Sequence, residues 1–488
     1  MRLYTHILAT LACIVLPGFA SATRFEAMCS SVNETSLPLI NIVFDEAELK
    51  RDRYIPCLVQ IAEYHNTLQS EQTTVEYKAT IRHRGGSSTR YEKKSFAIKL
   101  RDDNNKPLKK NLFGIRETGN WILDAMAVDR LRMRNRLCFD LWNEISSTPY
   151  QTAYGSRNGT NGVFVEVFVN SEYYGLYCLT DKIDRRLLAL EKTNGQSPNA
   201  ALHGFLYKGV AWNGAHGLRQ YDYPPSESET WLSYELKYPD GNIYSQYWQP
   251  LKDVVDFCSV STSDRLFKKH WTQYFYEQNV IDYMSFLLAL NIGDAPYKNT
   301  YLSVRDYSVD KRLLITPWDM DMSLGGNYDG AYLDTLTNTS KLDDIAPYNR
   351  LYAKDLCHFR NKLHRRLIAL LQTTLSPQHV DSCIGRYSEM FEQSGAWQRE
   401  VDRWNNNPVP LKADIKEETA YVSEWYRENH FWLLQYAQSQ IDKEYRRKNL
   451  IYILIVTAVF ILLTGVVTGV IIRKRNNKML IYSKENKL

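Results

Sequence analysis

The sequence predicts an α+β protein with a β-rich first lobe, an α-rich second lobe and a C-terminal transmembrane helix. Residues 73–88 and 91–100 alternate apolar and polar side chains, which is the pattern of paired strands. From residue 272 onwards, apolar residues recur at helical spacing. Residues 450–472 form a run of 23 positions without a charge, long enough to cross a bilayer with some tilt.

The two ends of the chain predict export and membrane anchoring. Residues 1–22 combine Arg2, an apolar core and a final Ala-Ser-Ala, the pattern of a signal peptide cleaved before Thr23. Basic residues flank the apolar segment on both sides, so its charges do not orient it. The signal peptide sets the orientation instead. We expect a single-pass protein with its main domain, residues 23–445 (core about 40–440), in the periplasm or at the cell surface, and residues 473–488 in the cytoplasm.

Composition excludes two classes of function. The chain has 488 residues and a net charge of +5, which is too small to favour nucleic-acid binding. Seven cysteines follow the signal peptide and none has CxxC spacing, so we expect no zinc site. Export permits disulfides, but an odd number leaves at least one thiol unpaired or paired with another molecule. The pairing stays open.

A basic glycine-serine turn joins the two strands predicted within residues 73–88 and 91–100. Residues 84–88 read RGGSS, and the strand that follows carries Lys99 in register with Lys93, opposite its apolar face. Lys94 shares the apolar face at its outer end. Glycine amides, serine hydroxyls and lysine ammonium groups together suit a bound phosphate group. An ordinary hairpin with a basic exposed face explains the same residues equally well.

The middle of the chain is predicted to mix helix, hairpin and irregular structure. Residues 111–144 look helical, with arginines at four alternate positions from 130 to 136. Alternate positions do not share one helix face, so we expect most of these arginines to be solvated or salt-bridged and one or two to line a nucleotide cleft. Residues 162–179 indicate a β-hairpin. Residues 194–250, rich in Gly, Asn, Ser and Tyr, predict a long irregular insertion or lid.

Two acidic loops separated by a predicted hairpin organise the second half. A helix with an apolar face, within residues 272–292, delivers the chain to Asp294, and Asn299 follows in the pattern D-x-x-x-x-N. Short β-rich runs at 301–305 and 312–316 then predict the hairpin.

Asp319 and Asp321 follow that hairpin directly, before two glycines that permit a tight turn. Protein kinases use the same order: an Asp for the acceptor hydroxyl, an Asn that holds Mg²⁺, and a later Asp that bridges metal and phosphates. These residue types suit the chemistry because the transferred phosphoryl group is anionic and its divalent cations prefer oxygen ligands. An Asx-rich turn followed by a surface loop is the alternative.

Four blocks of the sequence, taken together, resemble the spore coat protein H (CotH) kinase family. RHRGGSSTRYEKKSFAIKL (82–100) resembles its RGNSS…KKS motif, with Gly86 in place of Asn. GLYCLTDKIDRRLLAL (175–190) resembles its G-x-Y-x-L-x-E-K-I-D-R segment. The two acidic loops match the remaining blocks in the right order, the second of them as WDMD (318–321) followed by Gly325.

The resemblance implies a divergent protein-kinase-like bilobal fold that binds ATP with Mg²⁺ and phosphorylates Ser or Thr of partner proteins. Asp294 matches the catalytic aspartate of the family and Asp319 its metal-binding aspartate. Asn299 and Asp321 stand where the family keeps supporting polar residues, and we expect them to help hold the metal.

The same resemblance implies a phosphate-binding block. Arg84, Ser88, Lys94 and Lys99 lie in the block expected to meet the phosphates. Lys94 and Lys99 point to opposite faces of a regular strand, so we expect only one of them to bind, and which one stays open.

One residue departs from the family pattern. Asp181 stands in place of the Glu of the L-x-E-K-I-D block, shorter by one methylene, or roughly 1.5 Å. If that Glu pairs with a phosphate-binding Lys or a metal, its reach changes here. Alternatively, Asp181 caps a helix over residues 182–190.

Three functions are therefore compared. The first is an exported, membrane-anchored kinase whose partner is a Ser/Thr-containing protein at the cell envelope. The second is a cell-surface ligand-binding protein or adhesin, and the third a pseudokinase that binds nucleotide without turnover. Intact Asp294, Asn299 and Asp319 favour the enzyme, because an adhesin has no need of metal-binding carboxylates beside a basic hairpin.

Overall fold

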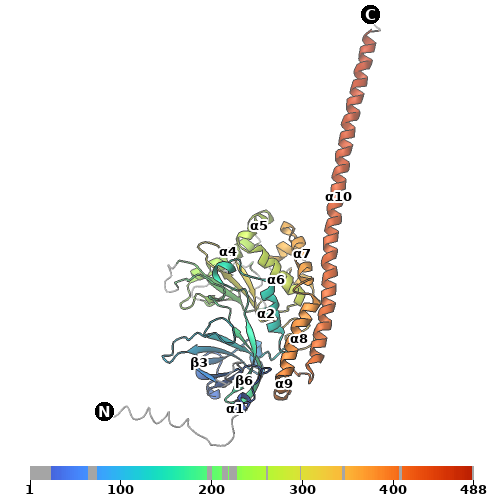
Figure 1. Ribbon diagram of the computed structural model, residues 1–488. Helices are drawn as coiled ribbons and strands as arrows, with labels where there is room; N and C mark the ends of the chain where they lie inside the picture. Colours follow the sequence, from blue (N-terminus) through green and yellow to red (C-terminus); the bar gives the residue numbers. More distant parts are fainter. Residues whose placement is uncertain are drawn as a thin grey trace, which may run out of the picture.

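The computed structural model describes residues 24–63, 74–194, 201–211, 218, 228–259, 262–296, 298–342, 347–405 and 409–485. The signal peptide expected at residues 1–22 lies outside these ranges. Figure 1 shows a β-barrel at one end of the folded domain, a second sheet beside it, a group of helices, and one long helix that leaves the domain at the opposite end.

The first half of the chain forms a closed barrel of seven strands in the order β1-β2-β3-β4-β5-β7-β6. All neighbouring strands are antiparallel except β1 and β6, whose parallel pairing closes the barrel. Alternate side chains of each strand point inward and form a separate apolar core. The strands are β1 (Leu39–Val43), β2 (Ile55–Ala62), β3 (Val75–Arg84), β4 (Ser95–Arg101), β5 (Asn120–Asp124), β6 (Gly162–Val169) and β7 (Glu172–Asp181).

A second, five-stranded sheet has the order β12-β11-β8-β10-β9. Its strands are β8 (Phe205–Gly209), β9 (Thr230–Trp231), β10 (Tyr234–Tyr238), β11 (Thr300–Val304) and β12 (Leu314–Pro317). One large apolar core joins this sheet to the surrounding helices. The helices of that core are α2 (Arg134–Ile145), α4 (Gln249–Cys258), α5 (Asp264–His270), α6 (Glu277–Leu290), α7 (Phe359–Leu371), α8 (Pro377–Gln393), α9 (Ala396–Trp404) and α10 (Ile415–Glu485), and the short helices α1 (Arg24–Cys29) and α3 (Gln151–Tyr154) stand apart from it.

The structure confirms two predicted hairpins: the one that contains the RGGSS turn and the one between the two acidic loops. β3 and β4 pair antiparallel across the RGGSS turn, with Lys99 opposite Thr80. β11 and β12 pair antiparallel, with Tyr301 opposite Thr316. The hairpin expected at 162–179 is also present, as β6 and β7.

Three expectations for the middle of the chain are wrong. Only residues 134–145 of the predicted 111–144 helix are helical, because 120–124 form the barrel strand β5. The stretch 194–250 contributes strands β8, β9 and β10 to the second sheet, so it is not simply an irregular lid. Residues 182–190 form turns instead of a helix, so Asp181 caps no helix there.

The arginines at 130–136 are structural and do not line the main cleft described below. Arg132, Arg134 and Arg136 are buried and pair with Glu400, Asp129 and Asp140 respectively. Arg130 donates to the backbone oxygen of Gly330. A buried guanidinium requires such partners, because an unpaired charge in the interior costs several kcal/mol.

Glu400 of α9 is the centre of a fully buried ionic cluster. Its carboxylate accepts from Lys93 Nζ at 2.6 Å, from Arg132 Nε at 2.7 Å and from the Leu176 backbone N–H at 2.8 Å. Burial lowers the pKa of Lys93 to about 7, against the opposing effect of Glu400. The cluster therefore ties a C-terminal helix to the turn before β4, to β7 and to the loop before α2.

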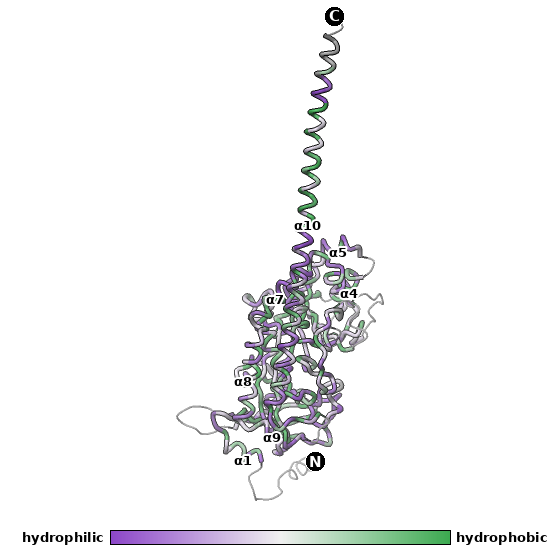
Figure 2. Tube along the Cα trace, turned by 90° about the vertical axis from the view of Figure 1, so that its right-hand side faces the viewer, coloured by the Kyte–Doolittle hydropathy of each residue, from purple (hydrophilic) through white to green (hydrophobic). Residues whose placement is uncertain are grey.

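Helix α10 runs without interruption from the folded domain into the apolar segment 450–472. Its first turns are buried against the domain through residues such as Val422, Tyr426 and Leu433, whereas the apolar segment is exposed over its whole length. Figure 2 shows the change from a hydrophilic to a hydrophobic stretch where α10 leaves the domain. Within the ranges that the structure describes, α10 is the single helix long and apolar enough to cross a membrane.

The α+β class and the long apolar C-terminal helix are thus confirmed. The closed barrel was not expected, and the second half contains a sheet as well as helices. The seven cysteines within the described residues are free thiols in the structure.

Candidate functional site

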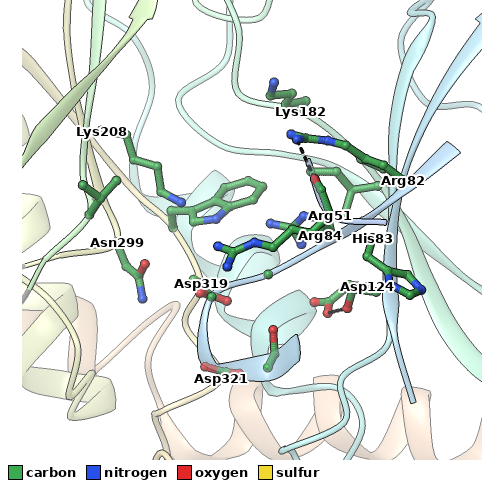
Figure 3. Close-up of a pocket in the computed structure, with 18 of the residues that line it drawn as sticks. Arg51, Arg82, His83, Arg84, Asp124, Lys182, Lys208, Asn299, Asp319 and Asp321 are labelled. Carbon is green, nitrogen blue, oxygen red and sulfur yellow. Dashed lines mark hydrogen bonds between the residues drawn. The ribbon is translucent and has the colours of Figure 1, made fainter. Parts of the chain in front are cut away.

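A cleft of about 1000 Å³ lies between the barrel and the second sheet. One wall consists of β3, β4, β5 and the RGGSS turn, and the other of β8, β10, β11 and the two acidic loops. Figure 3 shows acidic side chains gathered on one side of it and arginine and lysine side chains above and across from them. Its lining includes nine Arg or Lys residues and six Asp or Glu residues, so the cleft as a whole is positive.

The first acidic loop brings Asp294 and Asn299 together as the sequence predicted. Helix α6 ends at Leu290 because Asn291 adopts the left-handed conformation (φ 49°) and turns the chain into the cleft. Asn299 Nδ2 donates to Asp294 Oδ2 at 3.0 Å, and Lys298 Nζ lies 2.7 Å from the same oxygen. All three of these side chains line the cleft.

The second acidic loop follows β12 and is bonded to the first. The Trp318 N–H donates to the Asn299 carbonyl at 2.9 Å, and the Gly293 N–H donates to the Met322 carbonyl at 2.9 Å. Asn299 and Asp319 both have positive φ, at 58° and 56°. Such backbone strain is concentrated at functional sites, and Asn and Asp tolerate it best among non-glycine residues.

A glycine closes the second loop as expected. Gly325 has φ +74°, and a Cβ there would lie 2.9 Å from the ring of Trp425 on α10. The Tyr421 hydroxyl, also on α10, donates to the Gly325 carbonyl at 3.2 Å. Helix α10, which continues into the apolar segment 450–472, therefore supports the acidic loop directly.

Asp319 and Asp321 both line the cleft, and a third carboxylate, Asp124, stands beside them. Burial, followed by the negative charges of Asp319 and Asp124, raises the pKa of Asp321 well above its ordinary value. Asn135 connects Asp124 to the second acidic loop. Its Nδ2 donates to Asp124 at 2.9 Å, and its Oδ1 accepts from the Met320 N–H at 3.0 Å. Sequence reasoning missed Asp124 and Asn135, which no local pattern connects to the acidic loops.

Three of the predicted phosphate-binding residues line the cleft: Arg84, Ser88 and Lys99. The Arg84 guanidinium lies 5.7 Å from the ring of Trp318, directly above the acidic group. Burial, with Arg101 and Arg82 nearby, lowers the pKa of Lys99.

Lys94 does not line this cleft. Its ammonium group donates to the backbone oxygens of Thr89 and Tyr91 and so closes the RGGSS turn. The two lysines of the β4 block therefore have different surroundings: Lys99 faces the cleft and Lys94 supports the turn.

Asp181 also lies outside the cleft lining. Its buried carboxylate accepts from Arg116 Nε at 2.6 Å and from the Asn161 N–H at 2.9 Å, with Arg157 at 3.4 Å. The next residue, Lys182, does line the cleft, and burial and the charge of Lys237 lower its pKa. In the segment that resembles the family's L-x-E-K-I-D block, Lys182 therefore faces the cleft and Asp181 does not.

Lys208 of β8 is a cleft residue that sequence reasoning missed. Its ammonium group lies 5.8 Å from the rings of both Tyr301 and Trp318. Burial lowers its pKa to about 8, partly offset by Asp319. The residue lies in a stretch predicted to be an irregular insertion, so the sequence offered no reason to assign it to the cleft.

The oxygen donors of the cleft suit a hard divalent cation. Among the residues described, no three His, Cys, Asp or Glu side chains form a ready metal-binding cluster. Mg²⁺ normally keeps several waters and is held by one or two carboxylates together with substrate phosphates. Asp319, Asp321 and Asn299, which all line the cleft, offer oxygen donors of the kind that Mg²⁺ takes and not the nitrogen and sulfur donors of a zinc site.

Comparison with known proteins agrees with this geometry. The family model described as CotH kinase protein matches residues 81–433, a range that begins in β3 and ends in α10 and contains both acidic loops. No curated protein matches the chain. Because the matched range covers most of the sequence, the chain belongs to the CotH kinase family.

Proposed function

We propose that this protein is a membrane-anchored kinase that transfers the γ-phosphate of ATP, with Mg²⁺, to Ser or Thr of a partner protein at the cell envelope. The division of charge within one cleft carries the proposal. Asp294, Asp319 and Asp321 line the cleft together with Arg84, Lys99, Lys182 and Lys208. Figure 3 shows Asp319 and Asp321 on one side, with Arg84, Lys182 and Lys208 above and across from them. A bound triphosphate with its metal ion requires carboxylates for the metal and cationic side chains for the phosphate oxygens in the same site. The barrel and the sheet-and-helix unit are, in this proposal, the two lobes of a divergent protein-kinase-like fold.

Each side chain has a proposed role that follows from its position. Asp319 would hold the metal, with the help of Asn299 and Asp321, and the chemistry that the metal would supply when bound is neutralisation of charge on the phosphates. Arg84 and Lys208, which flank Trp318, bind the phosphate oxygens. Asp294 orients the acceptor hydroxyl and accepts its proton. Lys298 Nζ lies 2.7 Å from Asp294 Oδ2 and helps to position that carboxylate.

Asp294→Asn separates transfer from binding. We expect the variant to bind nucleotide with nearly unchanged affinity, because Asp294 meets the acceptor and not the phosphates. Transfer should slow by about 10²-fold or more, the usual contribution of general-base catalysis. The measurement is phosphate incorporation from labelled ATP into the protein itself or a candidate partner, beside a nucleotide titration with and without Mg²⁺.

Glu277→Gln, at the opposite end of α6 and outside the cleft, is the matched control and should leave both quantities unchanged. Unchanged transfer in Asp294→Asn would remove this residue from the mechanism. Nucleotide binding without transfer in the parent protein would favour a pseudokinase. Absence of both from the parent protein would favour a surface-binding protein.

We propose further that α10 crosses the membrane once, with the kinase domain outside the cytoplasm. The apolar segment 450–472 and the signal-like residues 1–22 support this topology. Protease added to intact cells or spheroplasts should remove the bulk of the protein and leave a fragment that contains residues 450–488. A cytoplasmic marker that survives the treatment is the control. Protection of the whole domain would reverse the proposed orientation.

A further inference from the structure

Helix α5 lies at the end of the folded domain from which the apolar part of α10 departs. Figure 1 shows α5 at this end of the domain, on the far side of α7 from α10, and Figure 2 shows that α10 turns from hydrophilic to hydrophobic at about the same level. The Cys357 thiol donates to the Lys268 carbonyl of α5 at 3.6 Å, and residue 359 begins α7. Asn361 of α7 in turn donates to Glu444 of α10. These contacts form a continuous path from α5 to α10.

The length of the connection sets the distance to the membrane. Leu450, where the apolar segment begins, lies six positions after Glu444. At 1.5 Å per residue of continuous helix, Glu444 lies about 9 Å from the edge of the hydrocarbon. The headgroup region of a bilayer is roughly 5–8 Å thick on each side. Glu444 therefore lies at the outer edge of the headgroup layer, and the end of the domain that carries α5 faces the headgroups (Figure 1).

The exposed side of α5 has the chemistry of a membrane-contacting surface. Leu266 is 53% exposed although it is a large apolar residue, and exposed Arg265, Lys268 and Lys269 surround it in the sequence. None of these three cations forms an ion pair with any residue that the structure describes. Phe267, on the inner side, is buried and stacks on Phe257 at 5.1 Å, which fixes the orientation of the helix.

The acids near this surface are already neutralised. Asp264 pairs with Lys354 at 3.0 Å, and Asp355 has Arg360 at 3.8 Å. The α5 surface therefore carries a net positive charge, in addition to the basic residues 446–448 that precede the apolar segment. Exposed lysines and arginines within a Debye length of an anionic bilayer are attracted to it.

We propose that α5 lies on the surface of the bilayer that α10 crosses. Arg265, Lys268 and Lys269 bind anionic phospholipid headgroups, and Leu266 enters the boundary between headgroups and acyl chains. This second contact fixes the rotation and tilt of the domain about α10. The barrel then lies at the end remote from the membrane (Figure 1). The proposal rests on α10 crossing a membrane and is independent of kinase activity.

The test uses the full chain in lipid nanodiscs, made of phosphatidylcholine alone or with added phosphatidylglycerol. A photoreactive benzophenone amino acid replaces Leu266, and the adducts are identified by mass spectrometry. We expect lipid adducts at position 266 in the anionic discs and far fewer in the neutral ones. The same probe at Ile461, within the apolar segment, should give lipid adducts in both, and at Val75 on the barrel in neither.

Two double variants, one on α5 and one on the barrel, test the contribution of the lysines. With the probe at position 266, Lys268→Gln together with Lys269→Gln should lower the adduct yield in anionic discs by about fivefold or more, since each lysine near an anionic surface contributes about a fivefold factor. Lys109→Gln with Lys110→Gln, an exposed pair on the barrel side, should leave the yield unchanged. Equal adducts in neutral and anionic discs, no lipid adduct, or a protein adduct at position 266 would each overturn the proposal.

Discussion

Asp319→Asn is expected to abolish metal-dependent nucleotide binding and to lower phosphate transfer by at least about 10³-fold, because a charged metal ligand stabilises the transferred group by several kcal/mol. The substitution keeps the size of the side chain. Asn also tolerates the positive φ of 56° at this position, so the loop should retain its shape. The measurement is a nucleotide titration at several Mg²⁺ concentrations, beside phosphate incorporation from labelled ATP.

Asp334→Asn is the matched control for this experiment. Asp334 is exposed, follows the same loop and does not line the cleft, so its variant should behave as the parent protein does. Together with Asp294→Asn, the comparison distinguishes two roles. Asp319→Asn should lose binding and transfer, whereas Asp294→Asn should lose transfer alone. Full Mg²⁺-dependent binding in Asp319→Asn would show that the metal is held elsewhere.

Glu400→Ala is expected to lower the free energy of unfolding by about 3–5 kcal/mol, because it leaves Lys93 and Arg132 as buried charges without their shared partner. It also removes the acceptor of the Leu176 N–H. Few single substitutions outside the cleft should destabilise the protein as much. Chemical denaturation of the full-length protein in detergent, followed by tryptophan fluorescence, measures the change.

Asp402→Ala on the same helix is the control. Asp402 is exposed and contacts Gln398 only through a surface hydrogen bond, so its loss should change stability by less than about 1 kcal/mol. A similarly small effect for Glu400→Ala would mean that Lys93 is neutral in the folded protein and that Lys93 and Glu400 do not form an ion pair.

The buried cluster also reaches the cleft. Arg132 donates to the backbone oxygens of Met126 and Ala127, and both of these residues line the cleft wall. Helix α10 supports the opposite side through Tyr421 and Trp425, which contact Gly325. The C-terminal helices therefore support both walls of the candidate site, although none of their side chains lines it.

Local patterns in the sequence predicted the features that depend on neighbouring residues. Alternation of apolar and polar residues identified the β3–β4 and β11–β12 hairpins, because strand faces repeat every two positions. The uncharged run at 450–472 identified the apolar helix, because bilayer thickness sets a minimum length. The spacing of Asp294, Asn299 and Asp319, with the resemblance of four blocks, identified the family before any fold was known.

Tertiary structure alone decided the features that join distant residues. The barrel closes through the parallel pairing of β1 with β6, which are more than 100 residues apart, and no local pattern encodes that register. Asp124 and Lys208 reach the cleft from strands that the sequence had assigned to a helix and to an irregular insertion. Lys94 and Lys99 could not be distinguished until the turn carbonyls that bind Lys94 were visible. Composition and periodicity report which face of an element is apolar, whereas the partner that covers each face is chosen by packing energies summed over the whole chain.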